Sequence, residues 1–289
     1  MLLVKEGIGD CLLLDVAKGL AKGKALDLQD FASLCKQDCL IEGSDDFSLL
    51  KNSDIVVITA GLARKPGMTR DDLLKINSGI IRDVSLKIKE FTNNPIVITI
   101  TNPVDLMVSL VYKFTGFDKK RVFGMGVSLD AGRFANLIHQ ALNASVKNIE
   151  PVVVASHGQA MLPLGRLTKV SGKSLDALVS PLDAARLKQE TVDRGASIVA
   201  ALGSGSAYFA PAMATVEIIS AIAKDEKRVI GVCAYLDGEY GVQGLYLGVP
   251  ACIGKSGVEK IIELELNAQE KEAFAQSAET IRAQLKVLS

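Results

Sequence analysis

Three consecutive stretches decide the fold of this chain: DIVVITAG (54–61), DDLLKINSGIIRDVSLKIKEF (71–91) and NPIVITITNP (94–103). The first and third are short runs of successive apolar residues, which is typical of strands buried on both faces of a parallel sheet. The middle stretch has apolar residues near helical spacing and two acidic residues in its first turn, so it predicts a helix. Strand, crossover helix and strand in this order indicate a doubly wound α/β domain, to which CLLLDV (11–16) adds another buried strand.

The second half of the chain has a different pattern. Helices are predicted at 129–143, 182–202 and 211–224, and PVVVASHG (151–158) predicts a strand that ends in a turn. Three strand-like segments between 228 and 264 predict an antiparallel hairpin or meander, and residues 267–288 predict an amphipathic final helix. We therefore expect two domains, a doubly wound one at 1–126 and an α+β one at 127–289.

The composition excludes several classes of protein. The 289 residues carry 33 Lys and Arg against 33 Asp and Glu, which argues against a nucleic-acid binder that relies on bulk positive charge. A hydrophobic content of 48% with 23% charged residues is typical of a globular chain, not of a disordered one. No membrane span is expected, because glycine and proline residues break the uncharged stretch between positions 194 and 217 into short pieces.

The five cysteines, at positions 11, 35, 39, 233 and 252, form no dense disulfide framework and no pair of C-x-x-C motifs. This usage favours a reducing compartment, and MLLVKEGIGD (1–10) shows no secretory signal, so we expect a cytoplasmic protein. Cys35 and Cys39 lie one helical turn apart, but no second Cys or His pair lies near them in the sequence. We therefore expect no metal site.

Asp15 directly follows the first predicted strand, where ligands of doubly wound sheets bind. An acidic residue there accepts hydrogen bonds from the adenosine ribose and selects NAD over NADP; a helix cap or a solvated side chain is the alternative. The Gly-x-Gly-x-x-Gly turn that should precede the acid by about 20 residues is absent. GIGD (7–10) lies too close to Asp15 to replace it. Either the sequence lacks the first strand, this turn and part of the first helix, or the protein never had them.

Polar side chains also follow the strands predicted at 54–61 and 94–103. Arg64 and Arg70 flank a Lys-Pro-Gly segment, and their planar guanidinium groups suit bidentate binding of a carboxylate. The amide of Asn102 can donate to a substrate oxygen and accept from a cofactor amide. A solvated basic loop and an ordinary Asn-Pro turn are the alternatives for these positions.

Asp130, Arg133 and His157 form the most specific group of polar residues. Asp130 and Arg133 lie at i and i+3 of a predicted helix and so project from one face, while His157 ends a strand and precedes a glycine. A carboxylate that meets His157 would fix its tautomer and stabilise the imidazolium, which makes a histidine a competent acid and base at neutral pH. A structural histidine is the alternative, and His139, the second histidine of the chain, is interpreted as a packing or surface residue.

Six ordered motifs give a more specific indication than any single residue. They are TAGLARKPGMTRDDLLKINSGI (59–80), ITNPVDLMV (100–108), GMGVSLDAGRF (124–134), SHGQAMLPLGRLTKVSG (156–172), GSGSAYFAPA (203–212) and LGVPACIGKSGVEKIIEL (247–264). Together they resemble the lactate/malate dehydrogenase superfamily, in particular its bacterial malate dehydrogenases of lactate-dehydrogenase-like fold, over essentially the whole chain. The resemblance implies NAD-dependent interconversion of malate and oxaloacetate, an NAD-binding domain at 1–126, a catalytic domain at 127–289, and a homodimer or homotetramer.

The resemblance also implies a role for each candidate residue. His157 is similar to the family's proton acceptor and Asp130 to the carboxylate that orients it. Arg133 resembles the clamp on the carboxylate next to the reacting carbon, and Arg70 the arginine that polarises the carbonyl. Arg64 resembles the arginine that pairs with the second carboxylate of a dicarboxylic acid, which favours malate over lactate. The implied cofactor contacts are Asp15, Asn77, Ile100, Thr101 and Asn102, the last also a substrate contact that precedes a cis proline.

The chain departs from the family's pattern at three places. GVSLDAGRF (126–134) and ASHG (155–158) replace the more usual GVLDSARF and GGHG, which changes small neighbours of the catalytic candidates but keeps the candidates themselves. The missing glycine turn would remove the pyrophosphate site at a helix N-terminus. Two alternatives therefore stand beside a malate dehydrogenase: a lactate or other 2-hydroxyacid dehydrogenase, and a non-catalytic paralogue that forms an oligomeric scaffold or binds a small acid.

Overall fold

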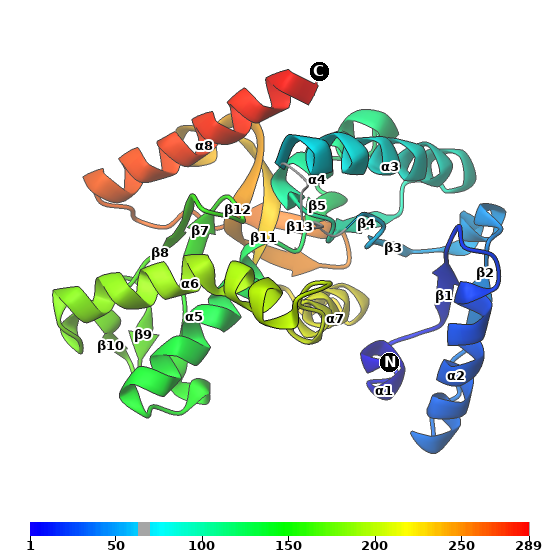
Figure 1. Ribbon diagram of the computed structural model, residues 1–289, viewed down its shortest axis with the longest axis horizontal. Helices are drawn as coiled ribbons and strands as arrows, with labels where there is room; N and C mark the ends of the chain where they lie inside the picture. The colour runs from blue at the N-terminus through cyan, green and yellow to red at the C-terminus, as the bar shows by residue number, and fades with distance from the viewer. Residues whose placement is uncertain (63–69, 289) are drawn as a thin grey trace.

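The computed structural model describes residues 1–62 and 70–288, without the side chains of residues 70 and 71. Within these residues an eight-stranded sheet runs through the centre of the molecule (Figure 1). Its parallel end consists of β3 (Ile55–Ile58), β4 (Ile96–Thr99) and β5 (Val122–Gly124). Antiparallel pairing continues the sheet through β11 (Arg228–Asp237), β12 (Gln243–Gly254), β7 (Val153–Ala155) and β8 (Met161–Pro163), with β13 (Gly257–Ile261) also paired to β12.

Helices cover both faces of this sheet (Figure 1). Along one face lie α3 (Arg70–Phe91), α4 (Val104–Thr115) and α8 (Ala268–Leu288), and along the other lie α5 (Val127–Leu142), α6 (Pro181–Leu202) and α7 (Phe209–Ala223). A small three-stranded sheet lies beside α5 and contains β6 (Ile149–Glu150), β9 (Lys169–Val170) and β10 (Lys173–Ser174). Short 3-10 helices are η1 (Phe47–Asn52), η2 (Val146–Asn148), η3 (Leu175–Ala177) and η4 (Glu239–Gly241).

The helices and strands predicted from the sequence are confirmed. The crossover helix at 71–91 is α3, the predicted meander is the antiparallel succession β11, β12 and β13, and the final amphipathic helix is α8. The last predicted strand is shorter than expected, because β13 ends at Ile261. One sheet runs through both halves of the chain, since β5 and β11 pair at Gly124 and Cys233.

The N-terminal residues form a second, smaller parallel sheet. It contains β1 (Cys11–Leu14) and β2 (Ile41–Ser44), with α1 (Leu2–Lys5) before them and α2 (Leu20–Leu34) between them. In the part of the chain that the structure describes, β1 pairs only with β2, and β3 pairs only with β4. The doubly wound sheet is thus divided between β1 and β3.

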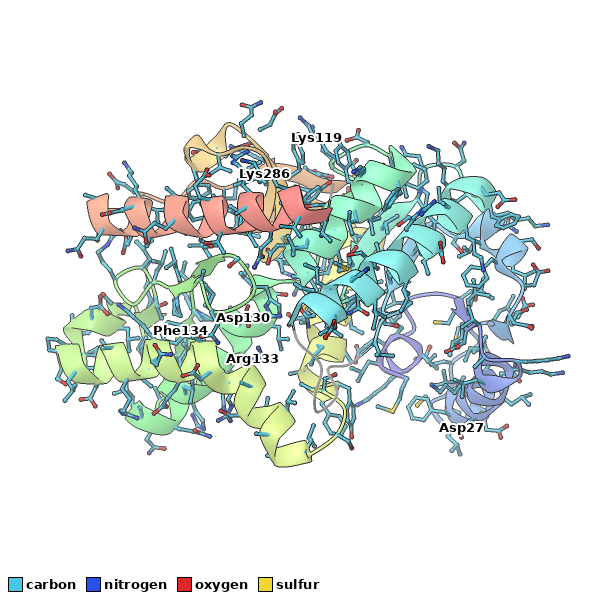
Figure 2. The ribbon with its side chains drawn as sticks, turned by 45° about the horizontal axis from the view of Figure 1, so that its top comes forward. Asp27, Lys119, Asp130, Arg133, Phe134 and Lys286 are labelled. Carbon is cyan, nitrogen blue, oxygen red and sulfur yellow. The ribbon has the colours of Figure 1, made fainter. Side chains whose placement is uncertain are left out.

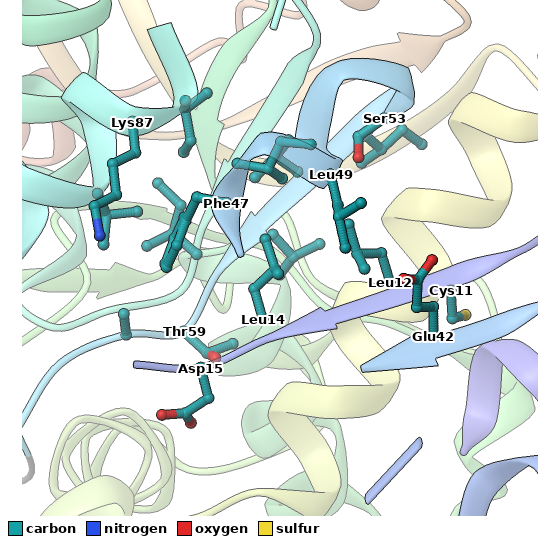
Figure 3. Close-up of a pocket in the computed structure, with 18 of the residues that line it drawn as sticks. Cys11, Leu12, Leu14, Asp15, Glu42, Phe47, Leu49, Ser53, Thr59 and Lys87 are labelled. Carbon is teal, nitrogen blue, oxygen red and sulfur yellow. The ribbon is translucent and has the colours of Figure 1, made fainter. Parts of the chain in front are cut away.

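A cavity of about 1050 Å³ lies at this division (Figure 3). Figure 3 shows Leu12 and Leu14 of β1 on one side, and Phe47 and Leu49 of η1 on the other. The side chains of β1 are therefore half-buried, whereas those of β4 are fully buried. The prediction that 11–16 is buried on both faces is wrong for this reason. The doubly wound fold has the strand order 3-2-1-4-5-6, in which β2, β1 and β3 of this chain correspond to strands 3, 2 and 4. The cavity lies between β1 and β3, at the place of the fold's strand 1, which the described residues do not supply.

Close packing in the centre of the large sheet depends on Gly248 of β12. A Cβ atom added at this position would lie 2.4 Å from the main-chain oxygen of Ala155 and 2.3 Å from Cγ1 of Val127. The absence of a side chain therefore lets β12 approach both β7 and the first turn of α5. These are the two elements that carry the polar residues described next.

The described residues contain neither a membrane-spanning helix nor a metal-binding cluster. None of their helices is both long enough and apolar enough to cross a membrane. No group of three or more His, Cys, Asp or Glu side chains among them is arranged to hold a metal ion.

Candidate active site

Asp130, Arg133 and His157 are brought together by α5 and the turn after β7. Helix α5 buries Phe134, Leu137 and Ile138 on the face towards the protein interior, and this packing fixes the orientation of its first turn, where Asp130 lies. The Asp130 Oδ2 atom lies 2.6 Å from His157 Nδ1, and Asp130 Oδ1 accepts a hydrogen bond from Arg133 Nη1 at 3.0 Å. Figure 2 shows Asp130 and Arg133 side by side near the centre of the molecule.

The electrostatic surroundings of His157 favour its protonated form. Burial alone lowers the pKa of the imidazole, because it removes water from the charged form. The charge and hydrogen bond of Asp130, with a further contribution from Asp105, outweigh burial and the repulsion from Arg133, so the pKa is raised above 6.5. A histidine with a bound carboxylate and an accessible edge can exchange a proton with a ligand; the His157 side chain is 11% exposed.

Arg133 has unused hydrogen-bonding capacity. Its side chain is 12% exposed, and its Nε atom is buried without a hydrogen-bond partner among the described residues. Gly195 of α6 lies against the guanidinium, and a Cβ atom added there would be 3.4 Å from Nη1. A buried donor without a partner costs free energy unless a ligand satisfies it, and a guanidinium fits a carboxylate. Arg133 is therefore arranged to receive an anion.

Asn77 links the loops that follow β3 and β4 through hydrogen bonds. Its Oδ1 accepts a hydrogen bond from the Leu62 main-chain nitrogen at 2.7 Å, and its Nδ2 donates to the Asn102 main-chain oxygen at 2.9 Å and to the Leu62 oxygen at 3.3 Å. Thr101 adds a second link, because its hydroxyl donates to the Ala60 oxygen at 2.7 Å. Ile100 extends the strand pairing, since its nitrogen donates to the Ile58 oxygen at 2.9 Å. The carboxyl ends of these strands are thus held in one surface, and the peptide bond between Asn102 and Pro103 is cis, as the resemblance implied.

Asp15 lies at the mouth of the cavity between β1 and β3. Figure 3 shows it beside Thr59, so the carboxyl ends of the two strands lie together. Its Oδ1 accepts a hydrogen bond from the Ala17 nitrogen at 2.9 Å, so part of the carboxylate is used in a local turn. The lining of the cavity also includes Ala60 and Gly61, but not His157, Asp130 or Arg133.

The residues expected at the cofactor lie on two surfaces. Asp15 lies at the mouth of the cavity, and Asn77 and Thr101 hold the loops after β3 and β4 together. A strand that leads into a Gly-x-Gly-x-x-Gly turn, the usual pyrophosphate site, is not present among the described residues.

Three other sequence predictions have different outcomes. Arg64 and the side chain of Arg70 lie outside the described residues. His139 lies on α5 with its Nδ1 atom 2.7 Å from the Ala144 oxygen, which agrees with a packing role.

Sequence reasoning missed three residues near the His157 turn. Asp105 of α4 accepts from the His157 nitrogen, Cys233 of β11 donates to Asp105, and Ser277 of α8 accepts from the Ser156 nitrogen. Asp105 is a single charged residue within the otherwise uncharged run VDLMVSLVY (104–112), which was a usable signal for a buried functional carboxylate. Ser277 lies in a charged amphipathic helix and gave no such signal.

Comparison with known proteins agrees with this arrangement. Residues 1–124 match the model of the lactate/malate dehydrogenase NAD-binding domain, and residues 127–288 match that of the lactate/malate dehydrogenase alpha/beta C-terminal domain. A malate dehydrogenase from Methanosarcina acetivorans is 46% identical over 274 residues, which cover 95% of this chain and 89% of the relative. One from Bacillus israeli is 45% identical over 289 residues, covering 99% and 93%.

Solved structures of related enzymes share the whole fold. The malate dehydrogenase from Aeropyrum pernix superposes with a TM-score of 0.96 at 40% identity, over 99% of this chain and 92% of that one. A lactate dehydrogenase from Cryptosporidium parvum, solved with lactic acid and NAD, also gives a TM-score of 0.96, at 34% identity and the same coverage. Both domain models and these similarities place the chain in the lactate/malate dehydrogenase family.

Proposed function

We propose that this chain is an NAD-dependent malate dehydrogenase that interconverts malate and oxaloacetate. The observation that carries the proposal is the contact of the Asp130 carboxylate with both His157, at 2.6 Å, and Arg133, at 3.0 Å. One carboxylate thereby aligns a proton acceptor with an anion-binding guanidinium. The similarity to several malate dehydrogenases at 42–46% identity supports the choice of this reaction.

His157 moves the proton of the reaction. Its Nδ1–H donates to Asp130, so Nε2 is the atom that takes the proton from the C2 hydroxyl of malate. The Asp130 carboxylate then stabilises the imidazolium, and in the reverse direction Nε2–H returns the proton to the carbonyl oxygen of oxaloacetate. Bound NAD would supply the hydride acceptor for C2 of malate, and the loss of this hydride together with the proton taken by His157 would convert the alcohol to a ketone.

The arginines bind the two ends of the substrate. Arg133 clamps the carboxylate next to the reacting carbon, for which its buried Nε and neighbouring Nη atoms supply donors. Arg64 pairs with the second carboxylate, and Arg70 polarises the carbonyl. The roles of these two rest on the sequence resemblance alone, since their side chains lie outside the described residues.

The cofactor site consists of Asp15, Asn77, Ile100, Thr101 and Asn102. Asp15 accepts from the adenosine ribose hydroxyls through the part of its carboxylate that the Ala17 turn does not use. Asn77 and Thr101 act by joining the loops after β3 and β4, which leaves Asn102 at the surface where the nicotinamide and the substrate meet. The boundary between the cofactor and catalytic domains lies at 126/127.

The assembly is a homo-oligomer in the cytoplasm. Supporting this, the uncharged stretch between residues 194 and 217 carries apolar side chains that are exposed in the single chain: Tyr208 is 63%, Phe209 75% and Met213 46% exposed. The rings of Tyr208 and Phe209 lie with their centroids 4.2 Å apart, and an exposed apolar cluster of this kind is typical of a subunit interface. Light scattering should give a dimer or tetramer mass, and Phe209→Glu should lower it.

The substrate is tested by comparing oxaloacetate with pyruvate in an assay of NADH oxidation. A lactate dehydrogenase is a second candidate, because the Cryptosporidium parvum lactate enzyme has the same fold. We expect oxaloacetate to be the preferred substrate, and Arg64→Gln to shift preference towards pyruvate. A chain that prefers pyruvate before any substitution contradicts the proposal. A chain that fails to bind NADH in a fluorescence titration points instead to a non-catalytic paralogue.

A further inference from the structure

The main chain that carries His157 has an unusual conformation just before it. Ala155, the last residue of β7, has a φ of +73°, which residues with a Cβ atom rarely adopt. Ala155 is fully buried, and it pairs with Gly248 on one side and with Met161 on the other. Such strained backbone persists only where the surroundings determine it.

Two side chains from distant helices accept the main-chain hydrogen bonds of the two residues that follow Ala155. The Ser156 nitrogen donates to Ser277 Oγ of α8 at 3.1 Å, across 121 residues of sequence. The His157 nitrogen donates to Asp105 Oδ2 of α4 at 2.9 Å, across 52 residues. Ser277 is 1% and Asp105 2% exposed, so water does not compete for either contact.

Asp105 is in turn held by Cys233 of β11. The thiol donates to Asp105 Oδ1 at 3.2 Å, and burial raises the pKa of this cysteine well above its ordinary value, which keeps the proton on sulfur. Burial also raises the pKa of the Asp105 carboxyl, while the charge of His157 and the two hydrogen bonds offset part of this effect. Each oxygen of Asp105 therefore faces a donor.

We propose that Asp105 and Ser277 are positioning residues, which fix the main chain at Ser156 and His157 so that the His157 ring meets Asp130 and the substrate. The proposal deepens the dehydrogenase function proposed above and rests on it for its kinetic consequences. Neither residue touches the substrate. Each acts by satisfying a buried N–H group next to a strained residue, and a misplacement of about 1 Å at a catalytic group can cost about 100-fold in rate.

Asp105 has a second effect, through its charge. Among the described residues, the charged groups that act on the His157 ring are Asp130 and Arg133 of α5 and Asp105 of α4, with Cys233 of β11 bound to Asp105. Asp105 and Asp130 both favour the imidazolium, whereas Arg133 opposes it. Replacing Asp105 by the neutral asparagine should therefore lower the pKa of His157.

Ser277→Ala and Ser85→Ala form a matched pair of variants for the first test. Both serines are buried helical residues, but Ser85 Oγ has no hydrogen-bond partner among the described residues. We expect Ser277→Ala to lower kcat about 10- to 100-fold with little change in the KM for oxaloacetate. It should also speed hydrogen exchange at the Ser156 amide. Ser85→Ala should change neither, and equal kcat and exchange rates in the two variants would overturn the role of Ser277.

The second test reads the pKa of His157 directly and does not depend on activity. The chain has two histidines, so an NMR titration of imidazole signals gives two curves, with His139 as the internal reference. Asp105→Asn should lower the pKa of His157 and leave that of His139 unchanged. An unchanged His157 pKa in a folded Asp105→Asn protein overturns the role of Asp105. If the shift appears in a chain that lacks malate dehydrogenase activity, the effect of the Asp105 charge on His157 stands and the proposed function fails.

If Asp105→Asn does not fold, a pair of variants that leaves Asp105 in place and changes only its donor Cys233 tests the same role. Cys233→Ser keeps a donor to Asp105 Oδ1, whereas Cys233→Ala removes it. Cys252→Ala, on the adjacent strand β12, is the control. We expect the pKa of His157 to move in Cys233→Ala and to be retained in Cys233→Ser and Cys252→Ala. The same pKa in all three variants contradicts the arrangement.

Discussion

Asp130 and His157 are joined at 2.6 Å although 27 residues separate them in the sequence, and the Asp130 side chain is fully buried. Helix α5 supplies the carboxylate and β7 supplies the turn that carries the ring. A buried carboxylate needs partners, and here they are the imidazole and the Arg133 guanidinium. In the proposed mechanism, these contacts couple proton transfer at His157 to substrate binding at Arg133.

Asp130→Asn should lower kcat by about 100- to 10000-fold in both directions, because general acid and base catalysis contributes about that much. The amide no longer stabilises the imidazolium, so the NMR pKa of His157 should fall as well. Asp183→Asn is a suitable control, since Asp183 makes an exposed ion pair with Arg186. If kcat is retained in Asp130→Asn, the carboxylate does not orient the acid.

The pH dependence should differ between the two directions. Reduction of oxaloacetate needs the protonated imidazole, and oxidation of malate needs the neutral one. The pKa of His157 is raised above 6.5, so reduction should persist to higher pH than an unperturbed histidine allows. For the same reason, oxidation should begin only at a correspondingly higher pH. Rates measured against pH in both directions check this, and a midpoint below 6.5 in the free enzyme would argue against it.

The same raised pKa makes a prediction about stability. The folded protein holds the His157 proton more tightly than the unfolded chain, so this contribution to the unfolding free energy is fully present below pH 6.5 and is lost as pH rises through the raised pKa. Denaturant titrations should show that Asp130→Asn destabilises the protein more at pH 6 than above the raised pKa. An equal loss at both pH values would mean that the ion pair contributes nothing.

Arg133→Lys should reduce kcat/KM by about 10- to 100-fold, because an ammonium cannot reproduce the planar donors of a guanidinium opposite a carboxylate. Arg186→Lys, which changes an exposed arginine at 51% side-chain exposure, should leave the kinetics unchanged. Steady-state kinetics with oxaloacetate as the varied substrate distinguish the two. Equal effects in the two variants would remove the case for Arg133 as the carboxylate clamp.

Gly248→Ala should destabilise the protein by about 1–3 kcal/mol, the usual cost of overpacking, because the new Cβ would lie 2.4 Å from the Ala155 oxygen. It should also lower activity, since Ala155 precedes the His157 turn. Gly23→Ala in α2 is the control, because nothing lies within 4 Å of its added Cβ. Alanine in place of this helical glycine should stabilise the protein by about 0.5–1 kcal/mol. Thermal unfolding compares them, and a neutral Gly248→Ala contradicts the close packing.

Much of the fold was predictable because it depends on local pattern. The apolar runs of β3 and β4 and the helical period of α3 each encode one element and indicate how the three connect. The burial of a strand, by contrast, depends on its neighbours in the folded sheet and not on the local sequence pattern. CLLL (11–14) has the composition of a buried strand but is half-buried, because its burial depends on a neighbour on each side and the described residues supply only one.

In the candidate site too, residues that depend on local spacing were predictable, and contacts between distant segments were not. Asp130 and Arg133 were predictable as a pair because helical spacing places them on one face, and His157 because it ends a strand. The contacts of Asp105 and Ser277 with the His157 turn join segments 52 and 121 residues apart, and no spacing rule reaches that far. Asn77 was expected at the cofactor, whereas its amide is occupied by Leu62 and Asn102, which only the folded loops reveal.

In the proposed reaction, His157 transfers the proton during the NAD-dependent reduction of oxaloacetate. The most direct test of this role is the kcat of oxaloacetate-dependent NADH oxidation by the 289-residue chain and by its two single histidine variants. We expect His157→Asn to abolish nearly all turnover while NADH still binds, and His139→Asn to retain turnover. Turnover in His157→Asn equal to that of the unmodified protein would show that His157 does not transfer the proton.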